Sequence, residues 1–152
     1  MSVTFQRETL AQSLADILGM TEEHWRALAR NKDIIPLDVD VAVYEAMEKA
    51  NSLMILTVRD DGRLIGYSVY IVRPHPHYRT TKWALSDLFW ITPKKRGAGV
   101  GKRMFEAAEM ELRKMGVVVM NTYHKLAHPE AGPLLESLGH EPIEMTYQKV
   151  IA

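Results

Sequence analysis

The stretch Trp90-Ile-Thr-Pro-Lys-Lys-Arg96-Gly-Ala-Gly-Val-Gly101-Lys102 decides the fold of this 152-residue chain. It carries an apolar strand into a glycine-rich basic turn that opens a helix. Unpaired N–H groups and the positive end of the dipole at a helix N-terminus favour a phosphate, and glycines let it approach the backbone closely. Arg96 adds a bidentate donor and Lys102 a point charge. The turn therefore predicts a diphosphate site, with a plain strand-to-helix turn as the alternative.

Two familiar phosphate-binding loops do not fit this spacing. The turn lacks the Gly-Lys-Ser/Thr sequence of a P-loop. It also lacks the Gly-x-Gly-x-x-Gly pattern followed about twenty residues later by an acidic residue, which a dinucleotide-binding fold requires. The diphosphate site is therefore expected to belong to neither class.

Composition predicts a single globular domain over residues 1–152, with 47% hydrophobic and 25% charged residues. Lys plus Arg and Asp plus Glu both number 19, and this balance argues against a nucleic-acid partner. The absence of cysteine excludes disulfide scaffolds, thiolate metal sites and cysteine nucleophiles, and it suits a reducing compartment. No apolar run approaches the ~18 residues of a membrane span. We therefore expect a cytoplasmic protein without a membrane partner.

The sequence on both sides of the turn predicts an α+β chain. Two apolar, β-branched runs flank Asp60-Asp61-Gly62 and predict a hairpin. The strand and the helix that adjoin the turn are expected at Trp83–Thr92 and Val100–Met115. Beyond them, hydrophobic period and turn residues predict a strand at Val117–Thr122, a helix at Glu130–Leu138 and a last strand at Ile143–Ile151.

The N-terminal part of the chain predicts a short strand at Val3–Phe5 and three helices. Apolar residues at three- and four-residue spacing predict a first helix, which Gly19 is expected to stop. Thr21 is expected to cap the second helix, and Val41–Ala50 to form the third. A loop rich in rings and basic groups, Arg73–Arg79, is expected to precede the strand before the turn.

The turn resembles the signature of the Gcn5-related N-acetyltransferase (GNAT) superfamily. That signature is Arg/Gln-x-x-Gly-x-Gly/Ala after a strand ending apolar-x-Pro, and this chain matches it as Arg96-Gly-Ala-Gly99-Val-Gly101 after Ile91-Thr-Pro93. The order of elements is similar to the family over nearly the whole chain. From Tyr44 onward the chain is also similar to small bacteriophage-encoded members, which place His-x-His-Tyr before the signature strand and an Asp within it.

The resemblance implies an α/β/α layered fold, with a mixed, mostly antiparallel sheet, a splayed strand pair and helices on both faces. It implies acetyl-CoA as the donor and no metal. Pantetheine would lie beside the signature strand near Phe89 and Ile91, where a strand N–H would stabilise the oxyanion. The pyrophosphate would bind the backbone of the turn, which consists of Arg96, Gly97, Ala98, Gly99, Val100, Gly101 and Lys102.

The acceptor amine must lose a proton before it attacks, because an amine with a pKa of ~10.4 is mostly protonated at pH 7. Asp87 lies in the signature strand, by alternation on the face of Phe89 and Ile91, and is the expected catalytic carboxylate. His77 is the second candidate, because an imidazole is better matched to neutral pH. That role requires the loop from His75 to Thr81 to fold back over the strand. A structural Asp and plain loop histidines are the alternatives.

Three further residues are candidates for the acceptor pocket: Tyr44, His75 and Tyr78. Ordinary packing is the alternative for both tyrosines. His75 and His77 form a His-x-His pair that could supply half of a metal site, but His124 and His128 are separated from it by the signature strand and its helix.

A second family motif is degenerate in this chain. Family members often carry Asn before a Phe-Tyr pair whose Tyr protonates the departing sulfur of CoA, whereas this chain has His128 and then Leu134-Leu135. His128, Tyr123 or His124 could supply that proton, or the thiolate could leave unassisted, since a thiol has a pKa of ~8.5.

The resemblance therefore implies an N-acetyltransferase that moves acetyl from acetyl-CoA to a primary amine by direct transfer in a ternary complex. The missing Tyr supports an alternative, an inactive acyl-CoA-binding protein of the same fold. The acceptor is left open as a small molecule or a protein. The family is often dimeric, which leaves a homodimer open.

Overall fold

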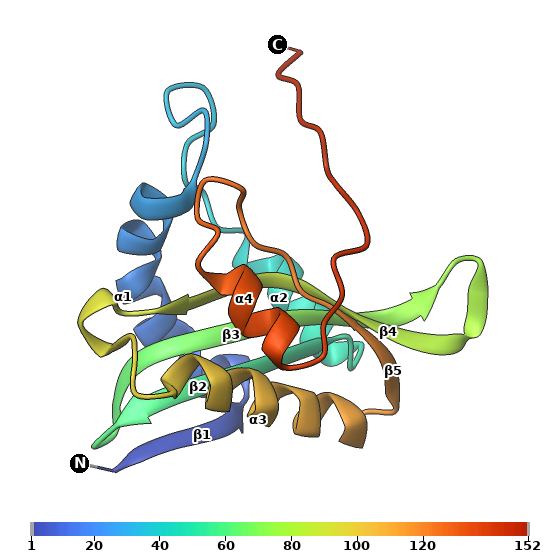
Figure 1. Ribbon diagram of the computed structural model, residues 1–152, viewed down its shortest axis with the longest axis horizontal. Coiled ribbons are helices and arrows are strands. Elements are labelled where there is room, and N and C mark those ends of the chain that lie inside the picture. Colours follow the sequence, from blue (N-terminus) through green and yellow to red (C-terminus); the bar gives the residue numbers. More distant parts are fainter. Residues whose placement is uncertain (1, 152) are drawn as a thin grey trace.

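The computed structural model describes residues 2–151, which build one five-stranded sheet between two layers of helices (Figure 1). The elements are β1 Val3–Glu8, α1 Leu10–Leu28, α2 Val41–Lys49, β2 Leu53–Asp60, β3 Arg63–His75, β4 Tyr78–Ile91, the 3₁₀ turn Pro93–Lys95, α3 Val100–Lys114, β5 Val117–Asn121 and α4 Ala131–Ser137. Strand order follows the chain, and each neighbouring pair is antiparallel except β4 and β5, which are parallel. The predicted layered α+β fold is confirmed.

Each face of the sheet buries its own apolar core. The core under α1 and α2 contains Leu10, Leu53, Ile55, Leu64, Tyr67, Val69 and Trp90. The core under α3 and α4 contains the buried side chains Met54, Leu56, Val58, Ile65, Tyr70, Val72, Ala84, Val100, Met104, Phe105, Ala108, Leu112, Met115 and Leu135. Strand alternation divides β3 between them, so Tyr67 lies on the α1/α2 face and Tyr70 on the α3/α4 face.

Helix α1 runs through Gly19, where the sequence predicted a break. Thr9 and Gln12 form a capping box at its start, and Thr21 lies mid-helix, where its hydroxyl donates to the carbonyl of Ile17 across 2.8 Å. The apolar spacing continues past Gly19 to Leu28, so packing on the sheet outweighs the helix cost of one glycine. Among residues 2–151, no helix is both long and apolar enough to cross a membrane.

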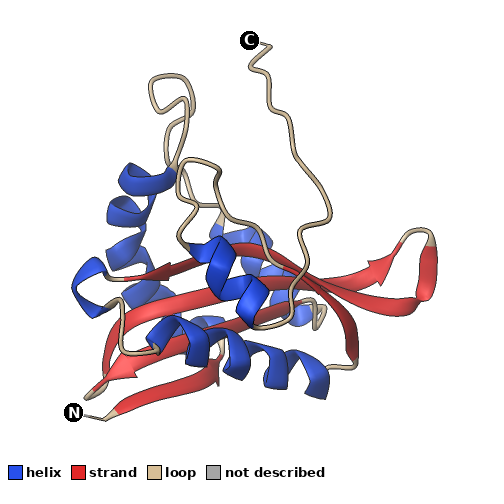
Figure 2. Ribbon diagram, in the orientation of Figure 1, coloured by secondary structure: helices blue, strands red, loops and turns tan. Residues whose placement is uncertain are grey.

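The ring-rich segment after β3 is a tight hairpin, where the sequence predicted a loop. β3 and β4 remain paired out to His75 and Tyr78, which leaves only Pro76 and His77 at the turn. The two strands extend beyond the rest of the sheet as an arm, seen at the right of Figure 2. Because the arm leads this segment away from the rest of the sheet, its expected fold-back over the signature strand β4 is wrong.

The predicted strand at Ile143–Ile151 does not form. Residues 140–151 have no regular structure and run away from the sheet to the C-terminus (Figure 1). A strand needs a neighbouring strand to satisfy its backbone groups, and this segment has none in the described chain. Its apolar side chains are consequently exposed, at 66% for Ile143, 62% for Met145 and 87% for Tyr147.

Candidate functional site

The turn between β4 and α3 presents unpaired backbone donors. Gly99 is the N-cap of α3, and Gly97, Ala98 and Gly99 all adopt positive φ, at 97°, 47° and 73°. Within residues 2–151, the N–H groups of Gly97, Ala98, Gly99, Gly101 and Lys102 have no hydrogen-bond partner. Five donors that converge on a helix N-terminus form a site suited to an anion.

The glycines of this turn have distinct structural roles. Gly97 and Gly99 hold left-handed conformations that a side chain would strain, and a Cβ on either would meet no atom within 4 Å. Open space therefore lies above the unpaired donors. Gly101 is different, because a Cβ there would lie 3.1 Å from the Leu134 side chain, so it lets α4 pack closely on α3.

Arg96 is held beside the turn by the strand that precedes it. Its Nε donates to the Ile91 carbonyl across 2.9 Å, and its guanidinium carbon lies 4.7 Å from the centre of the Trp90 ring. The side chain remains exposed, so its other N–H groups are available to a ligand. Lys102 is also exposed and lies 3.9 Å from Glu106.

Strands β4 and β5 diverge next to the turn. Their pairing ends at Leu85 and Asn121, whereas β4 continues to Ile91. The outer edge of β4 from Ser86 to Ile91 therefore has no strand partner in the described chain. Phe89 and Ile91 pack from this segment on the α3/α4 core. Among the described residues, three buried hydroxyls have no hydrogen-bond partner: those of Ser68 and Tyr70 on β3 and of Thr122 after β5.

A β-bulge changes the face on which Asp87 lies. Tyr70 pairs with Ser86 and Val69 with Leu88, so Asp87 is the extra residue of β4. Its carboxylate accepts a hydrogen bond from the Tyr44 hydroxyl of α2 at 2.5 Å, which places it on the α1/α2 face. Simple alternation put Asp87 with Phe89 and Ile91, and that expectation is wrong because the bulge shifts the alternation by one residue.

Tyr44 and Asp87, two sequence candidates, are thus brought together. Burial, and then the hydrogen bond to Asp87, raise the pKa of Tyr44 well above its ordinary value, so this hydroxyl stays protonated and donates. Asp87 is exposed, and its second oxygen has no partner among residues 2–151. A carboxylate held in this way can bind a cationic group.

The other candidates of the arm lie far from this pair. His75, His77 and Tyr78 cluster with Trp83 at its tip, where Tyr78 stacks on Trp83 at 6.1 Å. Along β3, His75, which pairs with Tyr78, lies five residues from Tyr70, which pairs with Ser86 beside Asp87. Five strand residues span ~16 Å at 3.3 Å per residue. The structure therefore does not bring His77 to Asp87. Among the described residues, no three potential His, Cys, Asp or Glu ligands gather to hold a metal ion.

The candidates for sulfur protonation lie on the segment between β5 and α4. Tyr123 is 51% exposed, and His128 is half-buried in a turn where its N–H donates to the Lys125 carbonyl. His124 lies beside Gly132, because a Cβ added at Gly132 would be 3.4 Å from Nε2 of His124. Leu135, aligned with the family Tyr, is buried in the α3/α4 core.

His24 on α1 was not identified from the sequence, although it contacts the signature strand. Its ring stacks on Trp90 with centroids 4.8 Å apart and planes at 18°, and its Nδ1 lies 2.8 Å from the Tyr67 hydroxyl. No role is predicted for His24 from the sequence, because it follows the expected cap Thr21 and shows no spacing to another polar group. Only the packing of α1 on β3 and β4 reveals it.

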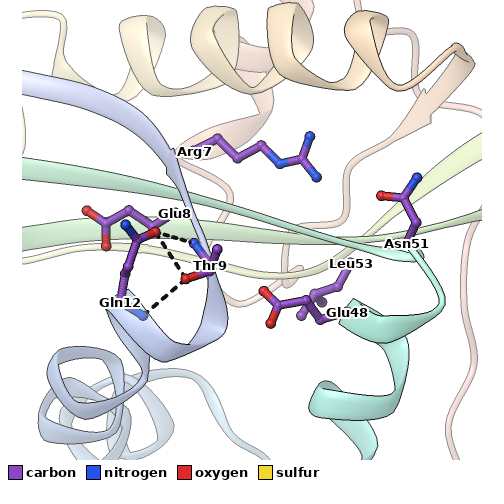
Figure 3. A pocket seen from close by; sticks show the side chains of 7 residues that line it. All are labelled: Arg7, Glu8, Thr9, Gln12, Glu48, Asn51 and Leu53. Carbon is purple, nitrogen blue, oxygen red and sulfur yellow. Dashed lines mark hydrogen bonds between the residues drawn. The ribbon is translucent and has the colours of Figure 1, made fainter.

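A separate pocket of about 340 Å³ lies at the start of α1 and the end of α2 (Figure 3). It is lined by Arg7, Glu8, Thr9, Gln12, Glu48, Asn51 and Leu53. None of these residues belongs to β4 or to the glycine-rich turn. The turn and the β4 edge, which offer unpaired donors, are therefore the better candidate site.

Comparisons with known proteins bear on the family and the fold. Residues 17–139 match the model of the family described as Acetyltransferase (GNAT) family. The fold is similar to that of a ribosomal-protein-alanine N-acetyltransferase from Brucella melitensis biovar Abortus 2308, with a TM-score of 0.76, 15% identity, and coverage of 99% of this chain and 100% of that one. It is also similar to AAC(6')-Iy in complex with the bisubstrate analogue CoA-S-monomethyl-acetylneamine, with a TM-score of 0.69, 20% identity and 99% coverage of both chains.

A curated relative, the glucosylglycerol-phosphate synthase of Pseudomonas anguilliseptica, is 25% identical over 121 residues. The match spans 78% of this chain but only 16% of the length of that protein. None of the three named proteins is described as bacteriophage-encoded, so the narrower similarity to bacteriophage members stays a prediction.

Proposed function

Because the chain belongs to the GNAT acetyltransferase family, we propose that it transfers an acetyl group from acetyl-CoA to a primary amine, directly and in a ternary complex. The observation that carries this proposal is the turn Arg96–Lys102. Among residues 2–151, five of its N–H groups are unpaired and the adjoining edge of β4 has no partner. An anion and an extended amide chain are the two ligands that such groups would satisfy together.

Two parts of acetyl-CoA, the diphosphate and the pantetheine, would find partners among the described residues. The diphosphate would accept from the backbone of the turn, with Arg96 and Lys102 adding charge. The amides of pantetheine would pair with the free edge of β4 near Phe89 and Ile91, as an added strand does. AAC(6')-Iy, of similar fold, has been solved with CoA. The thioester would then lie near the end of the β4–β5 pairing.

Asp87 and Tyr44 form the acceptor end of this proposal. Asp87 would hold the acceptor ammonium through its free oxygen, while Tyr44 fixes the carboxylate. Once neutral, the amine attacks the thioester carbonyl carbon, the C–S bond breaks and the thiolate leaves. His128 remains the proposed proton donor to that sulfur, because the segment that carries it leaves β5 where β4 and β5 diverge. The geometry gives no support to His77, His75 or Tyr78 in this site.

The acceptor class is proposed as a cationic amine, on a small molecule or a protein. The similar structures include both kinds, an enzyme named for a ribosomal-protein alanine and a complex with the analogue CoA-S-monomethyl-acetylneamine. We also propose a cytoplasmic location, which rests on the cysteine-free composition, and a homodimer, which rests on the exposed apolar side chains of residues 143–151. A bacteriophage-like origin, which rests on the His-x-His-Tyr segment, belongs to the same set of proposals.

Radiolabelled acetyl-CoA tests the proposal against its alternative, an inactive acyl-CoA-binding protein. The enzyme transfers label to at least one member of a panel of polyamines, aminoglycosides and peptides with free N-termini. A protein that only binds acyl-CoA gives a thermal shift with CoA but no labelled product. A chain that binds no CoA contradicts both readings.

A further inference from the structure

His24 is fixed above β4 by three elements of the structure. It lies on α1, stacks on Trp90 of β4 and contacts the Tyr67 hydroxyl of β3 through Nδ1 at 2.8 Å. Tyr67 is only 1% exposed and pairs directly opposite Trp90 in the sheet. A ring held in this way loses little entropy when it acts on a bound ligand.

The same indole ring also contacts the proposed donor site. Arg96 of the glycine-rich turn lies over Trp90 at 4.7 Å, so Trp90 connects the diphosphate-binding turn to His24. His24 is on the α1/α2 face, the face on which Asp87 and Tyr44 form their pair. Two hydrogen-bonded pairs, Tyr44 with Asp87 and Tyr67 with His24, therefore lie on the face of the sheet that α1 and α2 cover.

The charges around His24 favour its neutral form. Burial, followed by the cations of Arg96 and Lys125, lowers the pKa of His24 to about 4. The nearby hydroxyl of Tyr67 is itself kept protonated, because burial and the charge of Glu23 raise its pKa. At pH 7, His24 is therefore an imidazole with one nitrogen free to accept a proton.

We propose that His24 is the residue that takes the proton from the acceptor amine, which binds between α1 and β4 on the α1/α2 face. This inference rests on the proposed acetyl transfer. This role requires the tautomer in which His24 Nδ1–H donates to the Tyr67 oxygen, which leaves the lone pair on Nε2. An N–H bond of the ammonium breaks, its proton passes to Nε2, and the freed lone pair forms the C–N bond as the C–S bond breaks. The extra proton on the new amide nitrogen then passes through His128 to the departing thiolate.

Donor binding strengthens this base. A diphosphate bound to Arg96 offsets the cation that repels the protonated ring, so the proton affinity of His24 rises when acetyl-CoA is in place. Linkage requires the reverse as well, so CoA binds more tightly as the pH falls through the range in which His24 titrates. The base is consequently weak in the free protein and stronger in the complex that needs it.

The test is a histidine NMR titration of the full chain, with and without saturating CoA, assigned through His24→Gln. We expect the His24 resonance to titrate near pH 4 in the free protein and about one unit or more higher with CoA. Arg96→Gln raises the pKa of His24 in the free protein and removes most of the shift in that pKa that CoA causes. A His24 titration that CoA leaves unchanged overturns the linkage.

Kinetics test the catalytic role of His24. His24→Gln lowers kcat by about a hundredfold, leaves the KM for acetyl-CoA nearly unchanged and abolishes the acidic limb of the pH profile. His140→Gln, the same change after α4, is the matched control. A folded His24→Gln within about threefold of the parent contradicts the proton role. If the parent transfers no acetyl group at all, the proposed function fails, and the proton role of His24 fails with it. The effect of CoA on the titration of His24 does not need acetyl transfer, so it is tested independently.

Discussion

Tyr44 on α2 donates a hydrogen bond to Asp87 on β4 across 2.5 Å, although 43 residues separate them in the sequence. Asp40 caps α2 by accepting from the Val43 N–H, which fixes where the helix begins and so where Tyr44 lies. The bulge in β4 then turns Asp87 toward that helix. Two local features of the chain, a cap and a bulge, thus form the acceptor end of the proposed site.

Replacing Asp87 with Asn is expected to lower turnover by about a hundredfold without weakening acetyl-CoA binding. Asn keeps the shape and can still accept from Tyr44, but it removes the charge that would hold the ammonium. Steady-state kinetics with a true acceptor and calorimetry with acetyl-CoA measure the two effects separately. Asp61→Asn, the same change in the β2–β3 turn, should alter neither. A tenfold loss of acetyl-CoA affinity would place Asp87 at the donor site instead.

The fold was largely predictable from the sequence because its signals are local. The Asp-Gly turn at Asp61-Gly62, the glycine-rich turn and the 3.6-residue period of α3 each specify one element from its own residues. The predicted helix end at Gly19 was wrong because a glycine inside a helix costs only about 1 kcal/mol of helix stability, which the packing of α1 on the sheet offsets. The prediction of a strand at Ile143–Ile151 was wrong because a strand also needs a neighbouring strand to pair with. The alternation of apolar and polar residues in this segment does not supply that partner.

The site was less predictable, since its geometry depends on long-range packing. The turn Arg96–Lys102 was located by its motif, yet the face of Asp87 depends on a bulge that shows only in the pairing of β3 with β4. His24 is held by contacts with residues 43 and 66 positions away, Tyr67 and Trp90, and no local spacing indicates them.

Replacing Gly99 with Val is expected to abolish the thermal stabilisation that CoA gives the parent. A side chain at this position covers the donors of the turn, and ligand binding to the folded state alone is what raises Tm. The fold should survive, because a Cβ there meets no atom within 4 Å. The left-handed φ itself costs about 1–2 kcal/mol.

Gly116→Val is the matched control for that strain. Gly116 has a φ of +78°, against +73° for Gly99, and its nearest neighbour is the Lys82 amine at 4.0 Å. It lies beyond the opposite end of α3, whose 15 residues span ~22 Å at 1.5 Å per residue. The control should lose similar stability yet keep the CoA shift, measured by thermal unfolding. Parental affinity in Gly99→Val would mean that the turn does not bind the diphosphate.

The ion pair of Glu8 and Arg59 is expected to make stability depend on pH at the acidic end. Arg59 binds both oxygens of Glu8, at 2.7 and 2.9 Å, and the Glu8 side chain is 5% exposed. These hydrogen bonds lower the pKa of Glu8 from 4.5 to about 2 despite its burial. The unfolded chain therefore binds more protons between pH 4.5 and 2, so stability is present above this range and falls by up to about 3 kcal/mol across it.

Glu8→Gln tests this dependence by urea unfolding at a series of pH values. The variant should lose about 3–5 kcal/mol at pH 7, because Arg59 is left half-buried without its bidentate partner, and the acid-dependent fall should largely disappear. Glu22→Gln removes a solvent-exposed pair with Arg26 and should cost less than about 1 kcal/mol. Equal losses from the two variants would refute the assignment of the acid sensitivity to Glu8.

The exposed tail is expected to hold two copies of the chain together. Strand β5 is the last strand of the sheet, with no neighbour on its outer side in the described chain, and Val118 on it is 74% exposed. Residues 143–147 alternate apolar and polar side chains, the pattern of a strand with one buried face. Pairing this tail with a second copy would bury apolar surface that the single chain leaves in water.

Light scattering after size-exclusion chromatography measures the molar mass in solution and so the number of associated chains. The parent should have about twice the chain mass of 17.3 kDa. The triple variant Ile143→Lys, Met145→Lys, Tyr147→Lys should be monomeric, because three charges on the apolar face oppose its burial. Placing the same lysines on the alternate face, at Glu144, Thr146 and Gln148, should leave the dimer largely intact. A monomeric parent, or a triple variant that remains dimeric, would show that the tail does not join two copies.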